Sequence, residues 1–176
     1  TRKESSAASD VYKRQGVKAV AVQWPIGAEG DFRGVVDLLG LRALVWDLDD
    51  ASQPYRVTEV PAELMATVLQ QRARLVELAV EQDEAAMLAY LNGEELPAEV
   101  LRGCIRKGVL AGAFVPVLAG SAFRNRGVEP LLDAIVDWLP KPGEVALPCD
   151  PQAPFAALAF KVASDEHGAM VFVRVY

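Results

Sequence analysis

Short apolar runs separated by polar turns open the patterned part of the chain, which starts after residue 16. Val17 to Val22 is almost wholly apolar, as in a buried strand, and Trp24-Pro25-Ile26-Gly27 then supplies the proline and glycine of a turn. Three further β-type runs follow, at residues 32–38, 41–46 and 55–60. The pattern predicts a buried strand and then a small antiparallel sheet.

Helical spacing of apolar residues begins at Pro61. Pro61-Ala62-Glu63 is a typical helix start, with a proline and an acid in the first turn, and Asn92-Gly93 is a typical left-handed ending. Between them apolar residues recur on one face, which predicts a single long helix to about Leu91. Two more helices are predicted, one from Pro97 to near Gly112 and one at residues 128–139.

A second buried-strand pattern, Phe114 to Leu118, precedes the last of these helices. The connection between them contains Gly120, Ser121 and Ala122, which are small enough to let a planar ring approach the backbone. In an α/β sheet, ligands bind beyond the carboxyl ends of the strands, where backbone N–H groups of a strand-to-helix turn can reach them. The same short motif is also typical of a plain strand-to-helix connection.

The two ends of the chain differ from its middle. Residues 1–15 are polar and without periodicity, and we expect an extraneous or disordered leader there. The stretch at 144–154 is rich in proline, which is typical of an interdomain linker. Beyond it, the β-type runs at 155–162 and 170–176 predict a hairpin that begins a further domain.

Composition and charge narrow the function classes. No stretch holds the roughly 18–20 uninterrupted apolar residues of a membrane span, so we expect a soluble, cytoplasmic protein without membrane contacts. Cys104, Cys149 and the single histidine supply neither a disulfide framework nor a metal-ligand cluster. The formal net charge of -6 is a poor match for phosphate, which favours protein partners over a broad nucleic-acid surface.

Several motifs stand in a fixed order along the chain. They are Gln23-x-Pro-Ile-Gly27, Phe32-x-Gly-Val-Val-Asp-Leu38, Tyr90-Leu91-x-Gly93-Glu94-Glu95-Leu96, Gly120-Ser-Ala-Phe-x-Asn-x-Gly-Val128, Leu139-Pro-x-Pro142, Phe155-x-Ala-Leu-Ala-Phe-Lys161 and Phe172-x-Arg-Val-Tyr176. In this order and spacing the chain resembles the elongation factor G family of translational GTPases, from about Val17 to Tyr176. The family catalyses the movement of tRNA and mRNA through the ribosome with hydrolysis of GTP.

The resemblance implies an α/β fold in several parts. Residues 16–143 would be the C-terminal part of a P-loop GTPase domain, with an α+β insert subdomain at about 28–110. Residues 144–154 would be a linker, and 155–176 would be the first strands of a second, β-barrel domain.

The resemblance also implies binding residues. Gly120, Ser121 and Ala122 match the family's last guanine-binding loop, in which backbone N–H groups of the Ser-Ala pair face the guanine O6. The family's insert, especially its long acidic helix, is associated with the ribosomal stalk protein. Glu77, Glu81 and Glu84 would lie on such a helix here, although an acidic face of this kind is also typical of a solvated helix surface.

Other parts of the family's machinery do not occur in this sequence. It has no G-x-x-x-x-G-K-[ST] loop for phosphates, no Asp for the Mg²⁺ shell and no Asn-Lys-x-Asp for the guanine edge. In the family these motifs lie upstream, so we expect a fragment that neither binds nor hydrolyses GTP alone. Ribosomal RNA contacts are then expected only through the full-length protein.

Some alternatives remain open at the sequence level. A mitochondrial or paralogous elongation factor G, a ribosomal protection protein and a bacterial release-factor GTPase are close relatives within the class. A non-catalytic module that binds the ribosomal stalk is an alternative from a different class.

Overall fold

The computed structural model describes residues 18–47, 54–141, 144, 154–165 and 168–175. The expected leader at 1–15 and most of the expected linker at 144–154 lie outside these residues. The chain divides into two compact units, Thr1–Leu139 and Pro140–Tyr176, and each is described by itself. Helices and strands are mixed in the first unit, which is therefore an α/β structure.

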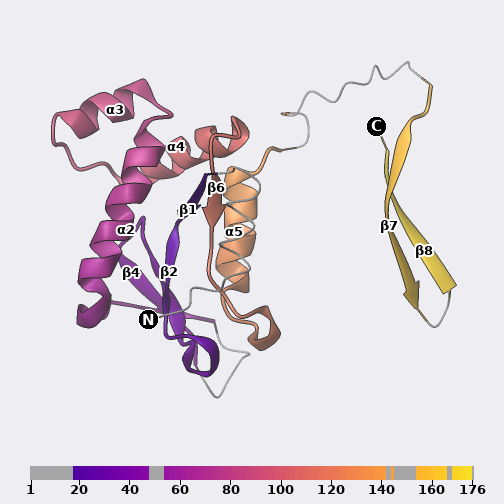
Figure 1. Ribbon diagram of the computed structural model, residues 1–176, viewed down its shortest axis with the longest axis horizontal. Helices are drawn as coiled ribbons and strands as arrows, with labels where there is room; N and C mark the ends of the chain where they lie inside the picture. The colour runs from indigo at the N-terminus through magenta and orange to yellow at the C-terminus, as the bar shows by residue number, and fades with distance from the viewer. Residues whose placement is uncertain (1–17, 48–53, 142–143, 145–153, 166–167, 176) are drawn as a thin grey trace. The chain divides into compact units, whose positions relative to one another are not determined.

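Two parallel strands from distant parts of the sequence lie at the centre of the first unit (Figure 1). β1 (Ala19–Ala21) pairs with β6 (Val115–Val117), and Val20 lies opposite Pro116. Among the described strands β6 pairs with β1 alone, so Pro116 occupies an edge position, where its missing N–H costs no ladder bond. Both predicted buried strands are thus confirmed as strands, and the structure shows that they are neighbours.

The segment between β1 and β6 begins with a four-stranded antiparallel sheet, as its short β-type runs predict. Its strands, in spatial order, are β2 (Gln23–Ile26), β3 (Gly34–Asp37), β4 (Arg42–Val45) and β5 (Arg56–Thr58). The predicted turn at residues 24–27 is wrong in part, because residues 23–26 are strand β2 and the chain turns at Gly27, with φ +82°. Pro25 is tolerated because β2 is an edge strand of this sheet.

Val22 joins the parallel pair to the antiparallel sheet. Its N–H donates to the carbonyl of Val117 at 3.0 Å, and its own carbonyl accepts from the N–H of Leu38 at 3.1 Å. One residue therefore bonds to β6 on one side and to the residue that follows β3 on the other. The two sheets are held in a fixed relation by backbone bonds.

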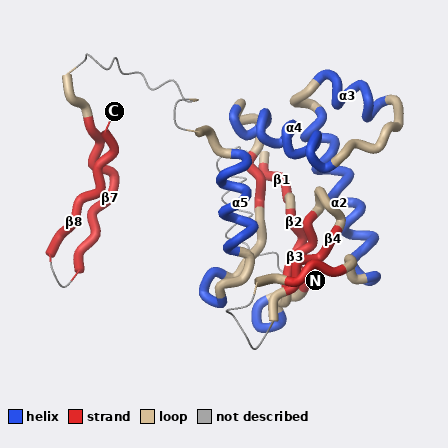
Figure 2. The backbone as a smooth tube through the Cα atoms, turned by 180° about the vertical axis from the view of Figure 1, so that it is seen from behind, coloured by secondary structure: helices blue, strands red, loops and turns tan. Residues whose placement is uncertain are grey.

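Helices pack on both sides of these strands. They are α2 (Ala62–Val80), α3 (Glu84–Leu91), α4 (Ala98–Leu110) and α5 (Val128–Trp138). The β1–β6 pair lies between α2 and α5, and α4 packs against both of these helices (Figures 1 and 2). The predicted helices near 97–112 and 128–139 are confirmed.

The predicted single helix from Pro61 to Leu91 is wrong, because the chain forms two helices with a break at Glu81–Asp83. Asp83 has extended backbone (φ -146°) and its carboxylate accepts a 2.9 Å hydrogen bond from the N–H of Ala86. A side chain that caps the first turn in this way starts a new helix rather than continuing the old one.

The antiparallel sheet is buried on both faces. On β3 and β4 the side chains of Val36 and Ala43 enter the main core, whereas those of Val35 and Leu44 enter a smaller cluster. The main core includes the fully buried side chains of Leu38, Leu75, Leu101 and Ile105. The smaller cluster is completed by Phe32 and Trp46, and Ala119 packs against it. Ala119 immediately precedes the loop that the sequence singles out.

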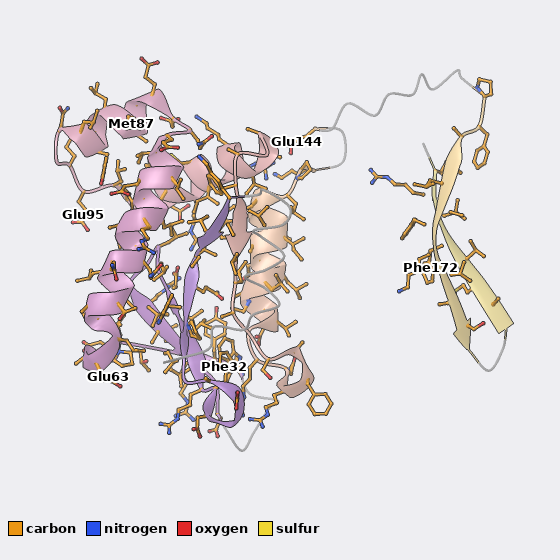
Figure 3. All side chains as sticks on the ribbon, viewed as in Figure 1. Phe32, Glu63, Met87, Glu95, Glu144 and Phe172 are labelled. Atoms are coloured by element: carbon orange, nitrogen blue, oxygen red, sulfur yellow. The ribbon has the colours of Figure 1, made fainter. Side chains whose placement is uncertain are left out.

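In the second unit the described residues form a hairpin of β7 (Ala157–Asp165) and β8 (Gly168–Val175). The pairing is antiparallel, with a register shift between Ala159 and Lys161. The Lys161 ammonium lies 5.3 Å from the centroid of the Phe172 ring, the residue labelled on this hairpin in Figure 3. The predicted hairpin is confirmed. Across both units, none of the described helices combines the length and the apolar character that crossing a bilayer requires.

Candidate functional site

The candidate loop lies at the carboxyl end of β6. The chain leaves β6 at Val117, passes through the short 3-10 turn η2 (Ala122–Arg124) and enters α5 at Val128. β1 runs parallel to β6, so the carboxyl ends of both strands point toward this region. Ligands of open α/β sheets bind at this position relative to the strands. Gly120, Ser121 and Ala122 therefore lie where the sequence predicts a ligand-binding connection.

Backbone hydrogen bonds close the loop on itself. The N–H of Ser121 donates to the carbonyl of Arg126 at 2.8 Å, and the N–H of Arg126 donates back to the carbonyl of Ser121 at 3.1 Å. Inside this bridge, the N–H of Asn125 donates to the carbonyl of Ala122 at 3.0 Å, and Asn125 has a left-handed backbone (φ 51°). Asparagine adopts that conformation more readily than most residues. The loop is a closed turn with its own internal bonds. The resemblance implies that the N–H groups of both Ser121 and Ala122 face the base, but in this structure the Ser121 N–H already donates to the Arg126 carbonyl.

Two glycines allow the ends of the loop to cross at close range. A Cβ atom on Gly120 would lie 2.9 Å from the carbonyl oxygen of Arg126, and one on Gly127 would lie 2.8 Å from that of Ala119. Gly127 also has φ +81°, a region that favours glycine. The backbone before the loop and the backbone after it are thus in direct contact.

Next to this crossing the surface is hollowed. A cavity of about 200 Å³ is lined by Leu118, Ala119, Gly120, Ala122, Arg126, Gly127, Val128 and Leu131. Ala122 is exposed, and its N–H has no described hydrogen-bond acceptor, as is usual at the first position of a helical turn. A carbonyl oxygen is the chemical group that such an N–H would bind.

Side chains from the candidate loop also bond to distant backbone. The guanidinium of Arg126 donates to the carbonyl of Phe32 at 2.8 Å and to that of Asp47 at 3.3 Å, and Arg124 donates to Gly30 at 3.1 Å. Before the loop, the N–H of Ala119 donates to the Gln23 side chain at 3.3 Å. The sequence does not predict roles for Arg124 and Arg126, because residues 124–127 have the pattern of a polar turn. It does not predict one for Gln23 either, because its partner Ala119 is 96 positions away. Arg126 is in fact only 4% exposed.

The three acidic residues are all exposed but do not belong to one helix. Glu77 lies in α2, Glu81 follows the end of α2 and Glu84 begins α3. The expected continuous acidic helix is therefore interrupted in the middle of the set. Glu77 therefore lies near the end of α2, Glu81 directly after it, and Glu84 on the other side of the break in α3.

An ion pair lies at that interruption. Lys107 of α4 contacts the carboxylate of Asp83, which lowers the pKa of Asp83 and raises the pKa of Lys107. In both cases the hydrogen bond between the two side chains is the largest cause, and for Asp83 the bond from the N–H of Ala86 comes next. The pair fixes the start of α3 to α4.

The described residues offer no group of three or more histidine, cysteine, aspartate or glutamate side chains that could hold a metal ion. Cys104 is buried on α4, and burial raises the pKa of its thiol, which is the environment of a packing residue rather than a nucleophile. Cys149 lies outside the described residues.

Comparison with known proteins gives a clear structural likeness. No family model matches the chain. The chain is similar to a solved structure from Thermus thermophilus, the crystal structure of ttk003000868, at 30% sequence identity and a TM-score of 0.71. The similarity covers 97% of this chain and 24% of that protein. The fold described here therefore recurs as a part of a longer protein.

Proposed function

We propose that this chain is part of a translational GTPase of the elongation factor G family and that its Gly120–Ala122 loop contributes to binding the guanine base of GTP. The observation that carries the proposal is the N–H of Ala122, an exposed residue whose N–H has no described acceptor and which lies in a closed turn at the carboxyl end of two parallel strands. The ordered series of motifs around the loop supports the family assignment. The protein would act on the ribosome, in the cytoplasm.

The loop can discriminate between bases by hydrogen bonding. The N–H of Ala122 is a donor, and guanine presents a carbonyl oxygen at the position where adenine presents an amino group. Adenine would place a donor against a donor and leave both groups without a partner, at a cost of about 1–3 kcal/mol. The cavity beside the loop is lined by the small residues Ala119, Gly120 and Ala122 together with larger side chains, among them Arg126 and Leu131.

Hydrolysis of GTP needs groups that this chain does not supply. The sequence has no phosphate-binding P-loop, and the described residues show no cluster of acidic side chains for Mg²⁺. In the proposed protein those groups, and the metal with them, belong to other segments of a longer chain. The part played by the residues described here is to bind and orient the base.

A proline substitution tests the role of the Ala122 N–H in a full-length protein that carries this chain. Ala122→Pro removes that N–H but no described intramolecular bond, and Ser121 (φ -131°, ψ 87°) lies outside the α-helical region that a following proline disfavours. We expect GTP affinity to fall roughly 10- to 100-fold and the preference for GTP over ATP to narrow, because one base contact is lost. Ala122→Gly keeps the N–H and serves as the matched control.

Competition binding of GTP and ATP to the two variants provides the measurement, with circular dichroism to confirm that both are folded. If a folded Ala122→Pro protein keeps the affinity and the discrimination of the parent, the loop does not read guanine. The proposed role of this segment is then wrong.

A further inference from the structure

We infer that Arg126 is a positioning residue for base recognition: its guanidinium holds the Gly120–Ala122 loop against the end of the inserted sheet, so that the Ala122 N–H is fixed before a nucleotide binds. The inference rests on the proposed function. It assigns Arg126 no contact with the nucleotide. It concerns how the loop is held, and through which part of the fold.

The two described acceptors of the guanidinium lie at one end of the antiparallel sheet. Phe32 lies shortly before β3 and Asp47 lies shortly after β4, and β3 and β4 are neighbours in which Gly34 pairs with Val45. The two carbonyls that accept from Arg126 therefore flank two adjacent strands at the same end, at 2.8 and 3.3 Å from its nitrogens. Figure 3 shows Phe32 at this end of the sheet. One side chain thus bonds to the backbone beside two neighbouring strands of the insert.

The backbone of the same residue closes the candidate loop. Both the N–H and the carbonyl of Arg126 bond to Ser121, and the Arg126 carbonyl oxygen is close enough to Gly120 to exclude any side chain there. Arg126 therefore connects the sheet to the loop, because its side chain bonds beside the sheet and its backbone bonds to the loop; Arg124, which donates to Gly30, adds a second and exposed connection.

The chemistry of arginine suits this arrangement. Burying a guanidinium is unfavourable unless its donors are satisfied, so a residue that only filled space here would be better apolar. A planar fork of fixed donors can bond two carbonyls at once and so sets a direction as well as a distance. A lysine could reach one of the two carbonyls at a time, and an apolar side chain could reach neither.

Hydrogen exchange in the 176-residue chain tests the anchoring itself. We expect Arg126→Met, which keeps much of the volume and removes the donors, to speed exchange of the bonded N–H groups of Ser121 and Arg126 by about 10-fold, because the loop opens more often. The matched control is Arg56→Met, since Arg56 also bonds to Asp47, at 3.3 Å, but through the exposed Asp47 carboxylate. The control should leave exchange in the loop unchanged. Unchanged exchange in a folded Arg126→Met chain would overturn the inference.

Nucleotide binding to the full-length protein tests the consequence for recognition. If the loop is binding-competent only about one-tenth of the time in Arg126→Met, affinity falls about 10-fold for nucleotides that use the loop. GTP and inosine triphosphate both present the ring carbonyl and should lose affinity equally. ATP should be unaffected, so that the preference for GTP over ATP falls by the same factor. Arg126→Lys should recover part of the loss, and it replaces Arg126→Met if that variant does not fold.

The outcomes separate this inference from the proposed function. Equal losses for GTP, inosine triphosphate and ATP would show that Arg126 only stabilises the fold, and the positioning role would be overturned. If Ala122→Pro narrows the preference for GTP over ATP but Arg126→Met does not, the loop reads guanine without help from Arg126. If neither variant changes the preference, the proposed function fails together with the inference.

Discussion

Gly127 is a position where both the backbone conformation and the close approach of neighbouring backbone atoms require glycine. Its φ of +81° disfavours a side chain, and a Cβ atom there would lie 2.8 Å from the Ala119 carbonyl oxygen and 2.9 Å from the Gly120 Cα. Neither of those neighbours is a flexible side chain that could move aside. The candidate loop therefore depends on glycine at this position for its shape.

We expect Gly127→Ala to lower the free energy of unfolding by about 1–3 kcal/mol, the usual cost of a strained backbone conformation. Urea denaturation of the chain provides the measurement. Gly103→Ala is the matched control: Gly103 lies within α4 with open space around its Cα, and alanine should stabilise the helix by about 0.5–1 kcal/mol. If Gly127→Ala were as stable as the parent, the crossing of the two backbone segments would not constrain the loop.

For single residues, the sequence points to the small residues of the candidate site but not to Arg126, which is charged and buried. Gly120, Ser121 and Ala122 can be found because small residues between a strand and a helix are visible in the sequence itself. Arg126 cannot be found in that way, because its burial depends on the carbonyl of Phe32, 94 positions away. A charged residue within a polar run is expected to be exposed to solvent unless a buried partner for it can be identified. The partner here is a backbone carbonyl, which every residue has, so no residue type in the sequence marks it.

At the scale of elements, the junction between α2 and α3 shows where periodicity is insufficient. No glycine or proline separates Leu64 from Leu91, so the sequence predicts one helix, and the break instead follows from the Asp83 side chain. Aspartate is tolerated inside helices and also favoured as a cap, so its type alone does not decide between the two. The contact with Lys107 of α4 favours the cap, and it exists only in the folded chain. The β-type runs and the helix at residues 128–139 are easier to predict from the sequence, because turn residues or prolines mark where they end.

The Asp83–Lys107 pair makes stability depend on pH at both extremes. The pKa of Asp83 is lowered from 3.8, so its contribution is present above that value and is lost as pH falls through the folded pKa, which is below 3.8. The pKa of Lys107 is raised from 10.5, so its contribution is present below that value and is lost as pH rises through the folded pKa, which is above 10.5. The pair therefore stabilises the fold across the pH range between 3.8 and 10.5.

Asp83→Asn isolates the ion pair from the helix cap, because asparagine caps helices about as well as aspartate but carries no charge. We expect the variant to have a lower melting temperature than the parent near pH 7. The difference should shrink as pH falls below 3.8 and through the lowered pKa of Asp83 in the folded parent, where the carboxylate becomes protonated. Thermal unfolding followed by circular dichroism from about pH 2 to about pH 8 measures the difference. A constant difference at every pH would show that the pair does not contribute through charge.

For the whole molecule, composition shows that the chain is acidic, and the structure shows where some of its acidic side chains lie. The net charge of -6 belongs to the whole sequence, and Glu77, Glu81 and Glu84 are exposed around the break between α2 and α3. Composition predicts the sign of the surface charge but not its distribution, which depends on how the helices pack. The resemblance implies binding of the ribosomal stalk protein through these three residues, and a test of that proposal must separate their position from the total charge.

We expect reversal of these three charges to lysine to weaken binding of the insert to the stalk protein and to reduce the salt dependence of the affinity. Exposed charge pairs contribute mainly through long-range attraction, which salt screens over roughly 8 Å at physiological ionic strength. The matched control reverses Glu59, Glu94 and Glu95, which are equally exposed and change the net charge by the same amount. Titrations of both variants at two salt concentrations separate a local contact from a general effect of net charge. Equal weakening by the two sets would mean that only the total charge matters, and no change in either would mean that Glu77, Glu81 and Glu84 form an ordinary solvated surface.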